Sequence, residues 1–174
     1  MKTVSEGQIK VYYGEGKGKS TAALGQAVCY AGSGKEVFVI QFLKGKLSRD
    51  LDYLTRLEPE LKIYRFEKTE EYYNDLSEEE KEEERFNVLN GVNFAKKVLK
   101  IGECDVLVLD ELLGLMDLGI LSEEEVLQML DMKNESMELI LTGRTLPDTI
   151  RERADIIFEI SVTKPEGNDG GSAE

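Results

Sequence analysis

A glycine-rich stretch near the start of the chain has the residue types that bind a polyphosphate. Residues 14–21 read Gly-Glu-Gly-Lys-Gly-Lys-Ser-Thr, between an apolar run at residues 9–13 and a segment of helical composition. Glycines let the backbone approach phosphate oxygens closely, and the N-terminus of the following helix attracts the anion. Lys19 supplies a positive charge and Ser20 a hydroxyl for an accompanying magnesium ion. The stretch predicts nucleotide binding.

The spacing of this loop is one residue shorter than the common phosphate-loop pattern. That pattern, G-x-x-x-x-G-K-[ST], requires glycine at position 13, where this chain has Tyr13. The alternative interpretation is a glycine-rich hairpin turn with incidental lysines. A strand before the loop and a helix after it favour the phosphate loop, because that context directs successive backbone N–H groups at one anion.

A second chemical signal is a pair of carboxylates after an apolar run. Residues 105–111 read Asp-Val-Leu-Val-Leu-Asp-Glu and predict a buried strand with Asp110 and Glu111 at its tip. Asp110 would hold magnesium, or its water ligands, opposite Ser20. Glu111 would orient water, bind the metal or contact the nucleotide. The alternative is a charged strand end that faces solvent.

Two further cations follow predicted strands. Lys44 lies in the loop after residues 36–42, and Arg144 comes directly after residues 138–142. Ligands of open α/β sheets bind at the carboxyl ends of the strands, so both cations are candidates for phosphate contacts. The alternatives are a solvated loop for Lys44 and a surface ion pair for Arg144.

The elements that must position these residues alternate between strand and helix. Apolar patterns predict strands at residues 9–13, 36–42, 61–66, 105–111, 138–142 and 155–160, and helices at 19–31, 48–57, 77–100, from 122 onward, and 147–154. The sum predicts an α/β fold with one doubly wound, mostly parallel sheet of about six strands, P-loop NTPase-like and RecA-like. Residues 1–163 form a single domain in this prediction, and residues 164–174 an acidic, disordered tail.

Composition narrows the function classes. The chain of 174 residues has a net charge of −13, and residues 67–84 alone hold ten acidic side chains, which argues against a nucleic-acid partner. The absence of histidine excludes histidine catalysis. No apolar run approaches the roughly 20 residues that cross a bilayer, and the polar start leaves no room for a signal peptide, so we expect a cytoplasmic protein. The two cysteines, Cys29 and Cys104, are expected to be buried free thiols.

Five stretches together resemble the ATP:corrinoid adenosyltransferases in order and spacing. They are residues 14–23, 41–45, 108–112, 141–144 and 154–155, and the likeness spans roughly residues 8–162. The resemblance implies transfer of the 5′-deoxyadenosyl group of ATP to Co(I) of a corrinoid, with release of triphosphate, in cobalamin biosynthesis or salvage. It also implies that ATP lies reversed relative to ordinary phosphate-loop enzymes, with carbon 5′ open to the corrinoid.

The resemblance assigns roles to individual residues. It implies catalytic roles for Lys19 and Glu111, and magnesium binding by Ser20, Asp110 and Glu111. ATP contacts are implied for Gly14, Glu15, Gly16, Lys17, Gly18, Lys19, Ser20, Thr21, Gln41, Lys44 and Arg144. In the central segment, where family members carry a phenylalanine and a tryptophan against the corrin, this chain has no tryptophan, and Phe66, Tyr72 and Tyr73 are the candidates. The family further implies a reduced flavoprotein as electron donor and a homodimer.

Two other functions use the same loop. The first is a P-loop ATPase or small-molecule phosphotransferase, which would release ADP. The second is a non-catalytic ATP-binding module whose acidic segment at residues 67–84 recruits a protein partner.

Overall fold

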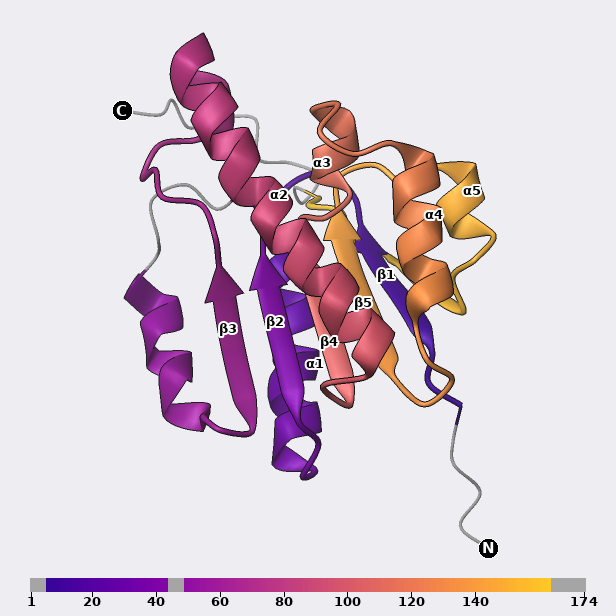
Figure 1. The fold of residues 1–174 in the computed structure, drawn as a ribbon. Coiled ribbons are helices and arrows are strands. Elements are labelled where there is room, and N and C mark those ends of the chain that lie inside the picture. Colours follow the sequence, from indigo (N-terminus) through magenta and orange to yellow (C-terminus); the bar gives the residue numbers. More distant parts are fainter. Residues whose placement is uncertain (1–5, 44–48, 164–174) are drawn as a thin grey trace, which may run out of the picture.

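The computed structural model describes residues 6–43 and 49–163. Its centre is a six-stranded sheet with the order β3-β2-β4-β5-β1-β6, and every neighbouring pair is parallel (Figure 1). The strands are β1 (Ile9–Tyr13), β2 (Val37–Gln41), β3 (Leu61–Arg65), β4 (Val106–Asp110), β5 (Glu138–Gly143) and β6 (Ile156–Glu159). The predicted α/β class and strand number are confirmed, and the sheet is wholly parallel.

Helices cover both faces of the sheet. The helix α1 (Lys19–Gly32) lies on one face, behind the sheet in Figure 1. The 3-10 helix η1 (Arg49–Leu57) is drawn beside the edge strand β3, and its Leu54 and Leu57 pack against the core on the α1 face. The other face carries α2 (Glu78–Ile101), α3 (Gly114–Asp117), α4 (Glu123–Met132) and α5 (Asp148–Arg151). A short 3-10 helix, η2 (Tyr73–Asp75), precedes α2. Helices on both faces explain the continuous apolar runs of β2 and β4, whose residues are all buried.

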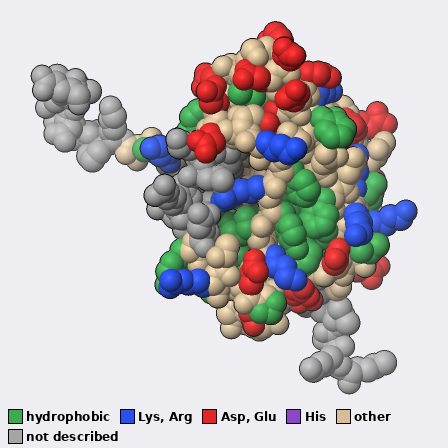
Figure 2. Space-filling view, turned by 60° about the vertical axis from the view of Figure 1, so that its left-hand side comes forward, with side chains coloured by type: hydrophobic (Ala, Val, Ile, Leu, Met, Phe, Trp, Pro, Cys, Tyr) green, Lys and Arg blue, Asp and Glu red, His purple; other side chains and the backbone are tan. Residues whose placement is uncertain are grey.

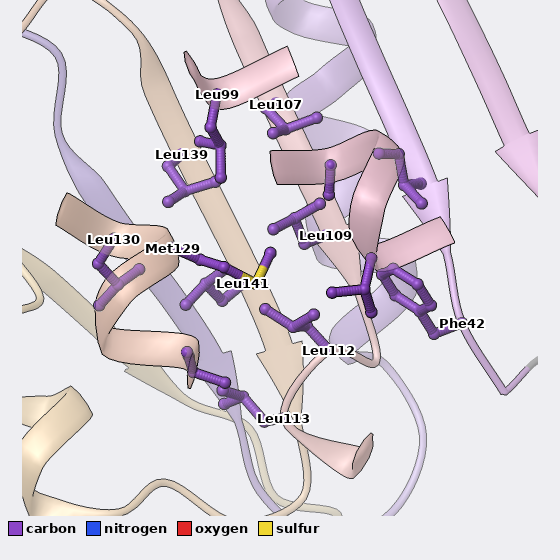
Figure 3. Packing of buried hydrophobic residues seen from close by; sticks show 14 of the residues in the cluster. Phe42, Leu99, Leu107, Leu109, Leu112, Leu113, Met129, Leu130, Leu139 and Leu141 are labelled. Carbon is purple, nitrogen blue, oxygen red and sulfur yellow. The ribbon is translucent and has the colours of Figure 1, made fainter. Parts of the chain in front are cut away.

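The larger core lies between the sheet and α2 and α4. Figure 3 shows leucines of β4 and β5 that face Leu99 of α2 and Met129 and Leu130 of α4. The core on the opposite face is built with smaller residues, since Ala23, Ala27 and Ala31 form the buried stripe of α1. Alanines at a spacing of four let α1 approach the sheet closely. The short loop between Tyr13 and Lys19 places the N-terminus of α1 at the carboxyl end of β1.

Local signals fix the ends of the two longer helices on the α2 face. Ser77 and Glu80 form a capping box at the start of α2, and Gly102 ends that helix with a φ of 66°. Ser122 and Glu125 form a second capping box at the start of α4. In each box the serine side chain and the glutamate side chain satisfy backbone N–H groups that the helix leaves unpaired.

The prediction that both cysteines are buried is wrong for Cys29, which is exposed, and correct for Cys104. Cys29 lies on α1 but outside the stripe of Ala23, Ala27 and Ala31 that packs on the sheet. The sequence of α1 did not indicate which face of the helix is buried, because its composition is largely apolar. Within the described residues, no helix combines the length and the apolar character needed to span a bilayer.

Candidate functional site

The phosphate loop and the carboxylate strand meet at the carboxyl edge of the sheet. Ser20, in the first turn of α1, donates a hydrogen bond of 2.8 Å to Oδ1 of Asp110, the last residue of β4. The Asp110 side chain is fully buried. Strand β5 separates β1 from β4, so the contact spans one intervening strand. The structure therefore brings Ser20 and Asp110 together, as the sequence predicted.

The loop between β1 and α1 has the backbone that phosphate binding requires. Gly14, Gly16 and Gly18 have φ angles of 132°, 91° and 117°, a region that other residues rarely adopt. Lys19 is 4% exposed, and its Nζ donates a hydrogen bond of 2.7 Å to the carbonyl of Gly16. The lysine is thus held across its own loop. Three other predicted loop contacts, Glu15, Lys17 and Thr21, have exposed side chains.

Residues 160–162, after β6, form a wall against this loop that the sequence analysis did not identify. A Cβ added to Gly14 would lie 2.2 Å from the carbonyl oxygen of Ile160, and one added to Gly16 would lie 3.2 Å from a methyl carbon of Val162. At Gly18 the added atom would be 3.4 Å from a methyl carbon of Ile160. Alternating glycines were the available signal, because they indicate close backbone approach.

Gln41 lies at the tip of β2, beside Asp110. Its Nε2 donates a hydrogen bond of 3.0 Å to Oδ2 of Asp110, and its Oε1 accepts one of 2.8 Å from Nε of Arg65. Gln41 is 1% exposed. Arg65 was not singled out in the sequence, since it ends a strand that carries no recognised motif. The structure places Gln41 as a link between Arg65 and Asp110.

Thr142 on β5 is another residue that the sequence analysis did not assign. Its hydroxyl donates a hydrogen bond of 2.7 Å to Oδ1 of Asp110 and accepts one of 2.7 Å from the backbone N–H of Glu111. Glu111 has a φ of 62°, an unusual conformation for a residue with a side chain. Leu43, after β2, has a φ of 55°. Strained backbone at the tips of neighbouring strands is common at functional sites.

The remaining predicted site residues have different surroundings. Arg144 is exposed and forms no ion pair with a residue in the described part of the chain, whereas Lys44 lies outside the described residues. Phe66 is half-buried against Phe94, with ring centroids 5.6 Å apart. Tyr73 is half-buried beside the same core, and Tyr72 is 69% exposed. Of the three candidates, Phe66 and Tyr73 are therefore partly buried in the fold, whereas Tyr72 is mostly exposed to solvent.

The segment after β3 carries acids at the upper end of the molecule. Figure 2 shows acidic side chains gathered there, where Figure 1 places the first turns of α2. A cavity of about 500 Å³ between this segment and α2 is lined by three acids, Glu80, Glu83 and Glu84, together with Lys68, Thr69, Leu76, Phe86 and Asn87. Burial raises the pKa of the neighbouring Glu67, and the charge of Glu84 adds to the effect, although the Leu43 N–H donates to Glu67 at 2.7 Å.

The parallel sheet, the glycine loop before a helix and the buried aspartate at a neighbouring strand tip define a phosphate-loop nucleotide-binding protein. The KaiC-like protein PH0186 from Pyrococcus horikoshii has the same general fold, with a TM-score of 0.55 and 16% identity over 91% of this chain and 75% of that chain. This likeness supports the predicted RecA-like architecture.

The family model for the ATP:corrinoid adenosyltransferases BtuR/CobO/CobP matches residues 5–174, and the chain belongs to this family of transferases. It is 32% identical to the corrinoid adenosyltransferase of Escherichia coli K12 and to the corrinoid adenosyltransferase CobA of Salmonella typhimurium, covering 97% of this chain and 83% of each relative. It is also 36% identical to the uncharacterized protein all2391 of Nostoc, of which it spans 43%. Family membership identifies corrinoid adenosylation in cobalamin metabolism as the activity.

Proposed function

We propose that this protein transfers the 5′-deoxyadenosyl group of ATP to Co(I) of a corrinoid and releases triphosphate intact. The observation that carries the proposal is the junction of Ser20 and Asp110 at 2.8 Å, beside a glycine loop, in a chain of the corrinoid adenosyltransferase family. In the reaction the Co(I) electron pair attacks carbon 5′. That pair becomes the cobalt–carbon bond. The bond from carbon 5′ to oxygen breaks, and triphosphate leaves with the electrons of the broken bond.

The chain is suited to this displacement because no proton has to be removed from the nucleophile. The sequence contains no histidine, and the reaction needs no general base. What the protein must supply is stabilisation of negative charge on the leaving triphosphate and alignment of carbon 5′ with cobalt. Backbone N–H groups of residues 14–20 and the N-terminus of α1 provide the first.

Lys19 is the proposed clamp of the leaving group. Its Nζ donates a hydrogen bond to the Gly16 carbonyl at 2.7 Å. A triphosphate in the loop would be a stronger acceptor than this neutral carbonyl, because its negative charge attracts the Lys19 ammonium group directly. We therefore assign catalysis to Lys19 together with Glu111, and ATP contacts to the loop residues, Gln41, Lys44 and Arg144.

The oxygen atoms at the edge of β4 fit a magnesium site. Magnesium in nucleotide sites is held by a hydroxyl and one or two carboxylates together with phosphate oxygens. Ser20 Oγ and Asp110 Oδ1 lie 2.8 Å apart, and Glu111 follows Asp110 directly. These residues would hold the ion, which would neutralise charge on the triphosphate.

For the corrinoid we propose the segment after β3, with Phe66, Tyr72 and Tyr73 as pocket residues. Phe66 is the best supported, since its ring packs on Phe94 and leaves part of its surface open. Gly91 of α2 permits this packing, because a Cβ there would lie 3.0 Å from the Phe66 ring. A flat corrin would gain contact area from such an aromatic surface.

The wider setting follows from the same assignment. We propose that the protein works in the cytoplasm as a homodimer and that a reduced flavoprotein supplies the electron that forms Co(I). The acidic segment at residues 67–84 makes nucleic acid an unfavourable partner.

An anaerobic product assay tests the proposal. The protein is incubated with ATP, magnesium and chemically reduced cob(I)alamin, and the expected products are light-sensitive adenosylcobalamin and free triphosphate in equal amounts. Release of ADP in place of triphosphate would instead identify a phosphotransferase or ATPase.

A Lys19→Ala variant serves as the active-site control for this assay, with Lys100→Ala, an exposed residue at the far end of α2, as the matched surface change. Loss of one charge-stabilising donor typically lowers kcat by about 10²- to 10³-fold. We expect a loss of that size for Lys19→Ala and none for Lys100→Ala.

A further inference from the structure

Thr142 contacts both carboxylate residues of the proposed magnesium site. Its hydroxyl lies 2.7 Å from Oδ1 of Asp110 and 2.7 Å from the backbone nitrogen of Glu111. The Thr142 side chain is fully buried. A hydroxyl carries a single proton, which is donated here to Asp110, so a lone pair is left to accept the Glu111 N–H. One side chain thereby fixes two consecutive residues of a different strand.

The backbone around Thr142 holds the turn that follows β4. The Thr142 carbonyl accepts a hydrogen bond of 3.2 Å from the N–H of Leu113, and the N–H of Gly114 bonds the Glu111 carbonyl at 3.1 Å. Gly143 lies so close to this turn that a Cβ would be 2.4 Å from Cβ of Leu113. The turn at residues 111–114 therefore packs directly against the tip of β5.

The contacts between this turn and the tip of β5 account for the conformation of Glu111. A φ of 62° is costly for a residue with a side chain, and such a residue persists only where its surroundings determine it. The hydrogen bonds from Glu111 N–H and Leu113 N–H to Thr142 bracket the strained residue. Without them Glu111 would relax toward an ordinary conformation and its carboxylate would point elsewhere.

We propose that Thr142 is a positioning residue that orients the Asp110 carboxylate and holds Glu111 in its left-handed conformation for the magnesium-bound triphosphate. The inference rests on the proposed magnesium site but not on the identity of the acceptor. Within the proposed function, the Thr142 hydroxyl sets the positions of the two carboxylates on which magnesium-dependent ATP binding depends.

The test compares Thr142→Val with Thr142→Ser. Valine keeps the shape and removes the hydroxyl, whereas serine keeps the hydroxyl. Binding of ATP is measured by calorimetry with magnesium and again with EDTA. We expect Thr142→Val to weaken ATP binding in magnesium by about tenfold or more, the scale of a lost hydrogen bond to a charged group. ATP binding in EDTA should stay within about twofold of wild type, and Thr142→Ser should restore the magnesium-dependent part.

The matched control is Thr149→Val, which removes the hydrogen bond from an exposed threonine on α5 to Glu123. It should leave both affinities unchanged. If Thr142→Val does not fold, as judged by its thermal unfolding, Thr142→Cys takes its place, because a thiol is a weak donor of similar size.

Several outcomes would overturn the inference. These are equal losses with and without magnesium, equal losses for serine and valine, and a wild-type ATP affinity that does not depend on magnesium. The product assay stays separate. A wild-type protein that makes no adenosylcobalamin, but whose magnesium-dependent ATP binding requires the Thr142 hydroxyl, refutes the proposed function and leaves this inference standing.

Discussion

The α-carbon of Gly14 lies so close to the backbone of Ile160 that a methyl group there would sit 2.2 Å from a carbonyl oxygen. The phosphate loop is therefore supported from the side by the chain that leaves β6. Gly14 also donates its N–H to the carbonyl of Gly143 at 3.3 Å, which joins the loop to β5. The close approach to Ile160 leaves no room for a side chain at position 14.

Gly14→Ala should destabilise the protein strongly. The added methyl group meets a backbone atom that cannot move aside, and the φ of 132° is unfavourable for alanine, so we expect a loss of about 2–4 kcal/mol in the free energy of unfolding. Urea denaturation measures it. Gly25→Ala is the control, since nothing lies within 4 Å of its Cβ position in α1, and it should raise stability by about 0.5–1 kcal/mol. Equal effects of the two changes would contradict this explanation.

Gly91→Ala should weaken corrinoid binding while ATP binding is retained. Its Cβ would lie 2.9 Å from the ring of Phe42, which is fully buried, and 3.0 Å from the ring of Phe66, so Phe66 is the side chain that must move. We expect a stability cost of about 1–3 kcal/mol. Spectroscopic titration with a corrinoid and calorimetry with ATP separate the two affinities. Ile101→Ala, at an exposed position at the far end of α2, is the control. An unchanged corrinoid affinity in Gly91→Ala would remove Phe66 from the proposed pocket.

The stability of the protein should depend on the titration of Glu67. Burial raises the pKa of its carboxyl group in the folded state above the reference value of 4.5. Stability present below that value is lost as pH rises through the folded-state pKa, because the unfolded chain releases this proton more readily.

Glu67→Gln removes this loss, and glutamine keeps an oxygen that can accept the Leu43 N–H. The variant should therefore gain stability relative to wild type between pH 4 and pH 7.5, as measured by urea denaturation across that range. Glu71→Gln, an exposed change in the same segment, is the control. A constant difference between Glu67→Gln and wild type at all pH values would contradict the prediction.

The two cysteines should react at very different rates. Cys29 is exposed, whereas burial raises the pKa of the Cys104 thiol to about 12. Only the thiolate reacts readily with iodoacetamide, so mass spectrometry of the native protein at pH 8 should show one modified cysteine and, after unfolding in urea, two. The Cys29→Ser variant should remain unmodified in the native state. Rapid modification of that variant would show that Cys104 is accessible.

The sequence predicted most of the architecture because the elements have unambiguous apolar patterns and ends. Gly102 and the capping box at Ser77 mark the limits of α2, and the run from Val106 to Leu109 is apolar throughout. It failed for Cys29 because an alanine-rich helix hardly distinguishes its buried face from its exposed one.

The site was predicted only where a residue belongs to a recognised pattern. Ser20 and Asp110 were identified by their motifs, and the structure shows their contact. Thr142 and Arg65 were missed, since a single threonine or arginine at a strand end has no distinctive spacing. Their importance comes from the order of the strands, which places Thr142 on β5 directly beside β4, and Arg65 on β3 next to Gln41 of β2, on the other side of β4.

Strand β5 separates the loop strand β1 from the carboxylate strand β4, and this order has a consequence for biosynthesis. Ser20 and Asp110 are 90 positions apart, and the strand that aligns them comes later still, at Glu138–Gly143. Contacts between distant parts of a chain form slowly, and chains fold as they emerge from the ribosome. A nascent chain that ends before β5 has both halves of the nucleotide site but cannot join them. Capture of ATP would therefore require that synthesis has passed β5.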